Sequence, residues 1–341
     1  MKIGLVGIKG SGKTTLFNAL LKRDRSSLFQ KEDNIGVVKV PDQRLDRIHS
    51  LHPNLRKVPA EITFIDLPTQ YHSDGRSFTR DSIAKIREVD GLGIVLGAFE
   101  GRDPFKEYES LNDEFIISDF IIVEKRLNIL KKQGRRDREF ELLSKFYKLL
   151  ESGRKIKEGG FSKEDLKLFS GFRFITEKPE IVIINVEEGD IATERVKRLE
   201  EEFKKRYSIE PIVISAELEY ELSRLDPEEQ KEFLINYGLS SPLIDRFIER
   251  SYRAMDLISF FTIGKEETKA WTIKKGTTVL KAAGKIHTDM ERGFIRAEVV
   301  SYKDYIEFGG EKECRAKGKY RLEGRDYIVQ DGDIITIKFN V

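Results

Sequence analysis

Eight residues close to the amino terminus give the strongest indication of how this chain folds. Residues 7–14 read Gly-Ile-Lys-Gly-Ser-Gly-Lys-Thr and fit the pattern G-x-x-x-x-G-K-[ST]. An apolar run at 2–6 precedes them and predicts a buried strand, and the leucine spacing at 15–21 predicts a helix. A glycine-rich loop between a strand and a helix is a P-loop, whose backbone N–H groups surround a polyphosphate. An ordinary glycine-rich turn is the alternative, and this context opposes it.

A P-loop assigns expected roles to individual side chains. Lys13 is expected to reach the β- and γ-phosphates and the Thr14 hydroxyl to bind Mg²⁺, so these two are the candidate catalytic residues. Asp66 ends a predicted strand at 62–65, where P-loop enzymes place an acid that helps hold Mg²⁺. A turn-forming aspartate is the alternative. The other loop residues expected to contact the nucleotide are Gly7, Gly10, Ser11, Gly12 and Thr15.

Further apolar runs, at 94–96, 181–184 and 212–214, predict the rest of the same sheet. They alternate with helical segments, which is typical of a parallel sheet covered on both faces. The sequence Asn-Val-Glu-Glu follows the second run, where guanine-specific proteins carry N-K-x-D. The longer glutamate displaces the acceptor that guanine requires, although a solvated glutamate pair is the alternative, so the choice between ATP and GTP stays open. The residues expected beside the base are Asn185, Val186, Glu188, Ser215 and Ala216.

The composition excludes several classes of protein. The chain has 341 residues, enough for two or three domains, and 39% of them are hydrophobic. Its 61 Lys and Arg nearly balance 59 Asp and Glu, so the net charge does not select a partner. A single cysteine, Cys314, excludes an internal disulfide and favours a reducing compartment. No apolar run approaches about 18 residues, so a cytoplasmic protein without a membrane partner is expected.

Residues 102–173 have a different character. Apolar residues recur at 120, 123, 127 and 130 and again at 140, 143, 147 and 150, with Gly134 between the two series. This spacing predicts a helical hairpin, an antiparallel coiled coil. Residues 125–157 hold 12 Lys or Arg against 4 Asp or Glu, a local net charge of +8, which fits either contact with RNA phosphates or a solvated hairpin. The candidate nucleic-acid contacts are Lys131, Lys132, Arg135, Arg136 and Arg138.

The residues from about 257 onward predict a separate small domain of mixed α+β type. Asp331-Gly332-Asp333 lies between the last two predicted strands and predicts a hairpin turn. No catalytic constellation is visible in this region. A helix is expected at 277–286, and short strands are expected at 259–263, 270–273, 296–300, 327–329 and 334–339.

Three stretches of the chain resemble the YchF / Obg-like ATPase family, within the Obg-type group of P-loop GTPases. Residues 40–46 read Val-Pro-Asp-Gln-Arg-Leu-Asp, and residues 185–188 are similar to the N-x-x-E that favours ATP over GTP in this family. The most specific stretch resembles the family's TGS domain and includes Ala-Trp-Thr-Ile at 270–273, Ile-His-Thr-Asp at 286–289 and Val-Gln-Asp-Gly-Asp at 329–333. The family also carries a coiled coil where the basic hairpin lies, so the resemblance spans nearly the whole chain.

The chain departs from the family's pattern at three places. The family P-loop reads G-x-P-N-V-G-K-S, whereas Lys9 and Gly10 replace the Pro and the Asn, which puts potassium stimulation in doubt. Residues 23–36 contain no Thr of the kind that closes onto Mg²⁺. After Asp66 the family's x-A-G becomes Leu-Pro-Thr, so the glycine whose N–H contacts the γ-phosphate is missing, and Pro68 has no N–H to donate. Nucleotide binding is expected to survive these changes, and hydrolysis is expected to be slow or lost.

The expected fold class is α/β, with a P-loop NTPase sheet, an inserted helical coiled-coil arm and a C-terminal α+β domain of the β-grasp, TGS type. The expected boundaries are 1–101 with 174–256 for the P-loop domain, 102–173 for the arm and 257–341 for the TGS domain.

The resemblance implies a nucleotide-binding switch protein. It would bind a purine nucleotide with Mg²⁺, hydrolyse ATP in preference to GTP, and engage the ribosome or structured RNA, as a monomer. Nucleotide state is expected to act through two loops, residues 23–36 and 66–75. The alternative is a non-hydrolysing ribosome- or RNA-binding module in which the arm and the TGS domain carry the function, and turnover measurements separate the two.

Overall fold

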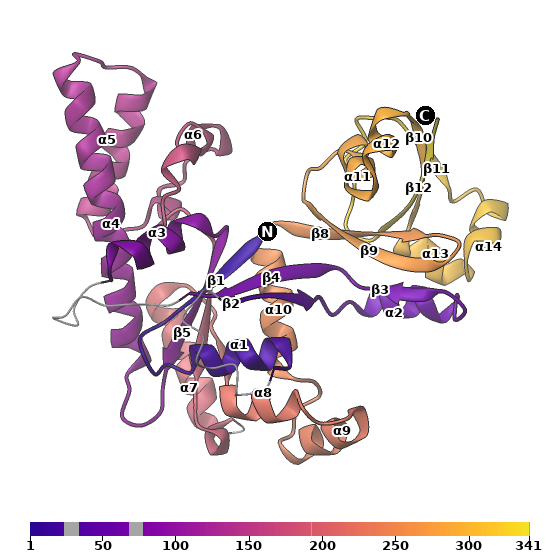
Figure 1. The fold of residues 1–341 in the computed structure, drawn as a ribbon, viewed down its shortest axis with the longest axis horizontal. Coiled ribbons are helices and arrows are strands. Elements are labelled where there is room, and N and C mark those ends of the chain that lie inside the picture. Colours follow the sequence, from indigo (N-terminus) through magenta and orange to yellow (C-terminus); the bar gives the residue numbers. More distant parts are fainter. Residues whose placement is uncertain (24–33, 68–77, 192, 341) are drawn as a thin grey trace. The chain divides into compact units, whose positions relative to one another are not determined.

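The computed structural model of this chain describes residues 1–23, 34–67, 78–191 and 193–340 (Figure 1). Most of the two expected switch loops, including Pro68, lies outside the described residues. The chain divides into two compact units, of which the first comprises residues 1–36 and 63–247 and the second comprises residues 37–62 and 248–341.

The first unit is built on a six-stranded sheet in the order β2-β4-β1-β5-β6-β7. β1 pairs in parallel with β4 and β5, β5 with β6, and β6 with β7. The five predicted strands of this sheet are confirmed, and their runs of Val, Ile and Leu are buried because helices cover both faces. The strands are β1 (Lys2–Val6), β2 (Asn34–Lys39), β4 (Glu61–Asp66), β5 (Gly91–Gly97), β6 (Glu180–Asn185) and β7 (Ile212–Ile214).

Helices connect these strands. The predicted helix at 15–21 is confirmed as α1, which packs against α8, and α7 is one of the helical segments expected between the strands. In the described ranges, no helix combines the length and the apolar composition needed to cross a membrane. The α-helices of the first unit are α1 (Lys13–Leu21), α3 (Arg80–Glu88), α4 (Pro104–Lys132), α5 (Arg138–Glu151), α6 (Lys163–Lys167), α7 (Glu194–Tyr207), α8 (Ala216–Leu222) and α9 (Pro227–Asn236), and short 3₁₀ turns are η2 (Ile156–Gly159), η3 (Ser170–Phe172) and η4 (Glu188–Asp190). α10 (Leu243–Ala254) contains the boundary between the units.

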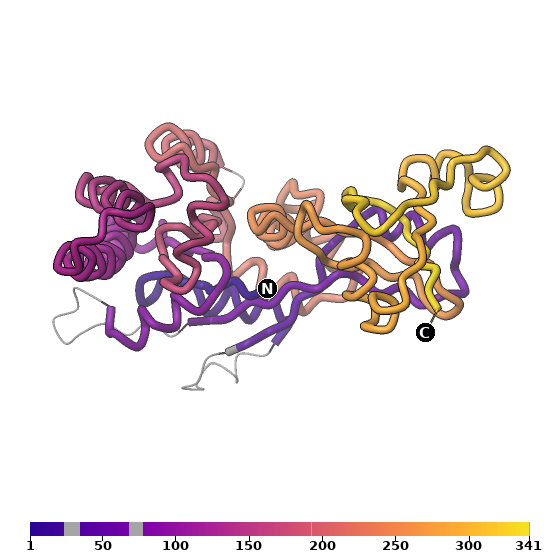
Figure 2. Tube along the Cα trace, turned by 90° about the horizontal axis from the view of Figure 1, so that it is seen from above, coloured from indigo at the N-terminus to yellow at the C-terminus, as the bar shows by residue number. Residues whose placement is uncertain are grey.

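The predicted helical hairpin is confirmed. Figure 2 shows α4 and α5 as neighbouring coils, and they are joined at Gly134, whose φ of +69° suits a glycine at a helix end. Buried side chains of both helices form one core with residues of the returning segment, including Val123, Leu127, Leu143 and Phe146. α4 continues without a break from the sheet domain into the hairpin, so the arm is not a separate compact unit.

The second unit contains a six-stranded sheet in the order β11-β10-β12-β8-β9-β3. α11 begins after Thr278 and packs its buried residues Val279, Ala282 and Ala283 into the core of this unit. The strands are β3 (Arg56–Val58), β8 (Leu257–Ile263), β9 (Glu267–Lys274), β10 (Phe294–Ser301), β11 (Arg321–Glu323) and β12 (Asp333–Phe339). The helices are α2 (Gln43–Ser50), α11 (Val279–Ile286), α12 (Thr288–Arg292), α13 (Tyr302–Phe308) and α14 (Glu311–Ala316).

Two predictions about the C-terminal region are corrected. Residues 327–329 form no strand; Ile328 makes an isolated bridge with Thr278, and the backbone on either side bonds to the start of α11. The predicted hairpin around Gly332 is therefore absent, and β12 pairs with β10 and β8 instead. The domain boundaries also differ, because residues 37–62 and 248–256, expected in the P-loop domain, belong to the second unit.

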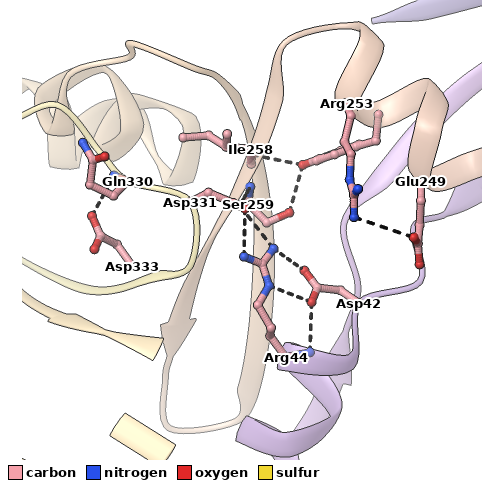
Figure 3. Close-up of polar contacts among 10 residues, drawn as sticks. Asp42, Arg44, Glu249, Arg253, Ile258, Ser259, Gln330, Asp331 and Asp333 are labelled. Atoms are coloured by element: carbon pink, nitrogen blue, oxygen red, sulfur yellow. Dashed lines mark hydrogen bonds and ion pairs between the residues drawn. The ribbon is translucent and has the colours of Figure 1, made fainter. Parts of the chain in front are cut away.

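Besides the pairing of β3 with β9, an ionic cluster joins residues 37–62 to the second unit (Figure 3). Asp42 accepts a hydrogen bond from the backbone N–H of Arg44 at 2.9 Å and so begins α2. The Arg44 guanidinium lies between the Asp42 carboxylate, at 2.8 and 2.9 Å, and the Asp331 carboxylate, at 2.9 and 3.1 Å. Asp331 also accepts from the Ser259 N–H of β8 at 3.0 Å. Two of the stretches that carry the family resemblance, 40–46 and 329–333, therefore meet at Arg44.

Candidate functional site

A cavity of about 640 Å³ lies at the carboxyl edge of the first unit's sheet. Parallel strands end at the same edge, so the loops after β1, β6 and β7 converge there. Of the residues predicted to contact nucleotide, those that line the cavity are Gly10, Gly12, Lys13, Thr14, Thr15, Asn185, Val186, Glu188, Ser215 and Ala216. Lining residues that were not predicted to contact the nucleotide are Ile8, Lys9, Phe99, Glu187 and Glu217. The predicted nucleotide contacts Gly7 and Ser11 are buried within the P-loop.

The P-loop adopts a conformation that requires its glycines. Gly10 and Gly12 have φ values of +84° and +90°, which side-chain-bearing residues rarely adopt. A Cβ on Gly12 would also lie 2.1 Å from the side-chain nitrogen of Asn185, so no other residue fits there. α1 begins at Lys13 without a side-chain cap, which leaves the N–H groups of its first turn for an anion.

Lys13, Thr14 and Asp66 meet at one end of this loop. Lys13 forms an ion pair with Asp66 and donates to the backbone oxygen of Leu67 at 2.7 Å. The Thr14 hydroxyl donates to the Asp66 carboxylate at 3.0 Å, and Asp66 is 6% exposed. Among the described residues, no three His, Cys, Asp or Glu side chains cluster as a metal site. Two neighbouring oxygen ligands nevertheless suit Mg²⁺, which takes few ligands from protein and the rest from phosphate and water.

Asn185 joins three loops around the cavity. Its side-chain nitrogen donates to the backbone oxygen of Ser11 at 3.1 Å, and its side-chain oxygen accepts from the N–H of Ala216 at 2.8 Å. The side chain is 6% exposed. Asn185 therefore holds the P-loop and the loop after β7 in register, a role that the sequence did not reveal.

Glu188 follows β6 and lines the same cavity. Its carboxylate accepts a hydrogen bond from the Tyr237 hydroxyl of the segment after α9, and this bond raises the pKa of Tyr237. Ser215 caps α8 by accepting from the N–H of Leu218 at 3.4 Å. One of the two Glu188 carboxylate oxygens is thus already engaged by the protein.

The five predicted nucleic-acid contacts lie away from the cavity, at the tip of the arm. Arg135 pairs with Asp137 and Glu139, and Arg138 pairs with Asp165 at 2.7 Å. Lys131, Lys132 and Arg136 are exposed and have no ionic partner in the described part of the chain. Arg136 stacks on the ring of Phe140 at 4.4 Å.

One residue beside the cavity was missed from the sequence. Arg102, in the loop after β5, donates to the backbone oxygen of Lys9 in the P-loop at 2.8 Å. No motif surrounds it. Its only sequence signal is its position just beyond the carboxyl end of a buried strand, the edge at which ligands bind in such sheets.

The chain is similar in sequence to known P-loop proteins. A family model described as a 50S ribosome-binding GTPase matches residues 2–126, and the model for the YchF GTPase C-terminal region, described as a protein of unknown function, matches residues 257–340. The chain is 36% identical over 360 residues to the ribosome-binding ATPase YchF of Haemophilus influenzae, covering 100% of this chain and 99% of the relative. It is also 36% identical, over 362 residues and 99% of both chains, to the ribosome-binding ATPase YchF of Bacillus subtilis.

The fold agrees as well. The solved structure of the Schizosaccharomyces pombe YchF GTPase matches with a TM-score of 0.89 and 29% sequence identity, over 99% of this chain and 97% of that one. The match therefore extends over the P-loop cavity, the basic helical arm and the C-terminal sheet unit of this chain. The chain belongs to the YchF family.

Proposed function

We propose that this protein is a P-loop switch that binds and slowly hydrolyses ATP with Mg²⁺ and that engages the ribosome. The observation that carries the proposal is the cavity formed by the P-loop, the loop after β6 and the loop after β7, which brings together ten residues expected at a nucleotide. Its curated relatives are named ribosome-binding ATPases. A single chain completes the cavity, which supports a functional monomer, and work on ribosomes implies the cytoplasm.

The phosphate end of the cavity has the required chemistry. The N–H groups from Gly10 to Thr14, apart from that of Ser11, which donates to the Ile8 oxygen at 3.0 Å, and the Lys13 ammonium would bind the phosphates. Thr14 and Asp66 would hold Mg²⁺, whose charge would neutralise the phosphate oxygens when it is bound. Changes in nucleotide would act on the two switch loops, of which residues 24–33 and 68–77 lie outside the described residues.

The base end supports adenine over guanine. Guanine offers two N–H groups side by side, so its recognition needs both oxygens of one carboxylate. The Tyr237 hydroxyl donates to one oxygen of Glu188 and so weakens that oxygen as an acceptor, which disfavours the paired N–H groups of guanine and leaves the other oxygen for the adenine amine. Both polar atoms of the Asn185 side chain are bonded to the backbone. Asn185 would therefore support base binding by positioning Ser11 and Ala216 and not by contacting the base itself.

Calorimetric titration of the purified chain with ATP and GTP, each with Mg²⁺, tests the proposal. We expect tighter binding of ATP, and loss of binding to Lys13→Ala. Tighter binding of GTP would contradict the proposed role of Glu188 in favouring adenine. Binding without turnover above the Lys13→Ala background, with and without ribosomes, would leave only the alternative of a non-hydrolysing binding module.

Tyr237→Phe isolates the base preference. It removes one hydroxyl and frees the second oxygen of Glu188, so we expect the ratio of ATP to GTP affinity to fall about 5-fold or more. Tyr220→Phe on α8 serves as a control for losing a phenol elsewhere in the first unit. An unchanged ratio in Tyr237→Phe would show that Glu188 does not discriminate through this bond.

The ribosome contact is proposed at the arm. Lys131, Lys132 and Arg136 are the candidates with free charges, whereas Arg135 and Arg138 are partly neutralised by their carboxylate partners. Free cations at the end of a protruding hairpin suit phosphate contacts, which position a protein on RNA without reading its sequence.

Reversing these three charges tests the arm. In Lys131→Glu, Lys132→Glu, Arg136→Glu we expect binding to ribosomes to weaken and the slope of log K against log salt to shrink by about 2. Lys204→Glu, Lys205→Glu on exposed positions of α7 is the control, in which two charges rather than three are reversed. Equal loss in both variants would indicate a general charge effect and remove the arm from the proposal.

A further inference from the structure

Arg102 is directed toward the P-loop by a tight turn after β5. The Arg102 N–H donates to the oxygen of Phe99 at 3.0 Å, and the two residues between them, Glu100 and Gly101, have φ values of +51° and +76°. Two successive positive φ values are the pattern of a type I′ turn, which is unusual for a glutamate. A residue held in such a conformation is more common at functional sites than elsewhere.

The Arg102 guanidinium lies at the rim of the nucleotide cavity. It donates to the Lys9 oxygen at 2.8 Å and stacks 5.8 Å from the centre of the Phe99 ring. A Cβ placed on Gly10 would lie 2.5 Å from the same guanidinium nitrogen. Lys9, Gly10 and Phe99 all line the cavity, so the Arg102 guanidinium lies directly against three of its lining residues.

A buried carboxylate fixes this position. Glu107, in the first turn of α4, is 7% exposed; it accepts from Arg102 at 2.7 Å and from the N–H of Gly97 at 2.8 Å. A guanidinium carries five N–H donors, and these contacts use two of them. For the others, the described residues offer no acceptor. The side chain is thus held rigidly while part of its hydrogen-bonding capacity is unused.

We infer that Arg102 is a catalytic residue that contacts the terminal phosphates of bound ATP, an inference that rests on the proposed ATPase function. In hydrolysis a water oxygen bonds to the γ-phosphorus, the bond from this phosphorus to the bridging oxygen breaks, and ADP, phosphate and a proton are released. Negative charge grows on the bridging and terminal oxygens, where a fixed guanidinium stabilises the transition state more than the substrate. Arg102 supplies a donor in a chain whose segment after Asp66 has lost the family's glycine N–H.

The test compares Arg102→Gln, Arg102→Lys and Arg195→Ala in the full-length protein. Glutamine keeps a donor for the Lys9 oxygen but removes the charge. Lysine keeps the charge but lacks the paired N–H donors of the guanidinium. Arg195 donates to the oxygen of Ala98 in the same loop at 2.8 Å without touching the P-loop, so it controls for loss of an arginine nearby. We measure ATP and ADP affinity, kcat, and retention of ADP with aluminium fluoride, an analogue of the transition state.

For both Arg102 variants we expect kcat to fall about 100-fold or more, with ATP and ADP affinities within about 3-fold of the parent. Retention of ADP with aluminium fluoride should be lost in Arg102→Gln and kept in Arg195→Ala. Unchanged kcat would overturn the inference and leave the proposed function intact. Equal losses of ADP, ATP and the fluoride complex would also overturn it, because they would show that Arg102 only shapes the P-loop. Failure of the parent protein to bind or hydrolyse ATP would overturn the inference and the proposed function together.

Discussion

Glu219 is a buried carboxyl group that holds the start of α10. It is 1% exposed, and one oxygen accepts from the Leu243 N–H at 2.8 Å while the other has no partner within the described ranges. Burial raises the pKa of Glu219 to about 7, against the lowering effect of its backbone hydrogen bonds and with a smaller contribution from Asp245. The folded chain therefore binds the Glu219 proton more tightly than the unfolded chain does.

This difference predicts a dependence of stability on pH. As pH rises from about 4.5 to about 7, the unfolded chain loses the proton first, so the free energy of unfolding falls by about 3 kcal/mol and then levels off. Urea unfolding followed by far-ultraviolet circular dichroism at about pH 5 and about pH 8 measures this change in the free energy of unfolding. Glu219→Gln should flatten the slope, and Glu221→Gln, exposed on the same helix, should not. Parallel slopes for the parent and Glu219→Gln would refute the assignment.

The residues of the candidate site differ in how far sequence could predict them. Lys13 and Thr14 belong to a contiguous motif, and Asp66 was expected beside them because it ends a neighbouring strand; the structure brings the three together. Their roles at the nucleotide stay predictions. Arg102 and Tyr237 have no motif, because the first reaches the P-loop through a local turn and the second meets Glu188 across 49 residues.

At the scale of elements, the root of the arm is held by a buried ion pair. Lys155, in the segment returning from α5, contacts both oxygens of Glu180 at 2.7 and 2.9 Å and the Tyr108 hydroxyl of α4 at 3.2 Å. Lys157 contacts the same carboxylate at 2.7 Å but is 28% exposed. Burial alone would raise the pKa of Glu180, but the two lysines outweigh this effect and hold that pKa at about 2. The pair therefore joins β6, α4 and the end of the arm.

Removing the buried cation should loosen this junction. We expect Lys155→Met to cost about 3 kcal/mol, because it leaves a buried carboxylate with one weaker ionic partner, and Lys157→Met to cost about 1 kcal/mol or less. Lys155→Met, Glu180→Leu should recover part of the loss, since the unpaired charge is gone. Urea unfolding gives the energies, and hydrogen exchange in β6 and in the first half of α4 locates them. Equal costs for the two lysines would exclude a special role for burial.

Strands were predicted correctly where their hydrophobic pattern was strong and were missed where it was weak. The parallel strands were predicted because both faces are buried, which makes them nearly continuous apolar runs. β2 was missed because it is an edge strand in which Ile35 and Val37 are exposed, so its pattern is weak. Residues 327–329 looked like a strand because they are apolar, but their backbone pairs with the start of α11.

At the scale of the whole molecule, the chain passes between the two units after Gly36, after Ile62 and after Phe247. The first two crossings enclose residues 37–62, which interrupt the first unit in sequence but belong to the second, where β3 pairs with β9. No local pattern could reveal this, because it depends on pairing across more than two hundred residues. Arg44 and its two carboxylate partners are one side-chain link of that segment to its unit, and the ion pair of Arg56 with Glu267 at 2.5 Å is another.

Arg44→Ala should therefore release residues 37–62 without affecting the nucleotide cavity. We expect a loss of about 2 kcal/mol, because Asp42 and Asp331 lose a shared cation that is 29% exposed and stacks 5.4 Å from the Phe261 ring. Lys57→Ala, which breaks an exposed ion pair with Asp46 in the same segment, should cost about 0.5 kcal/mol or less. The rate of hydrogen exchange in α2 and β3 should rise only in Arg44→Ala.

The affinity of Arg44→Ala for ATP should match that of the parent, because every lining residue of the cavity belongs to the first unit. A fall in ATP affinity would mean instead that the Arg44 cluster influences the nucleotide cavity, and that the two units do not act independently in nucleotide binding.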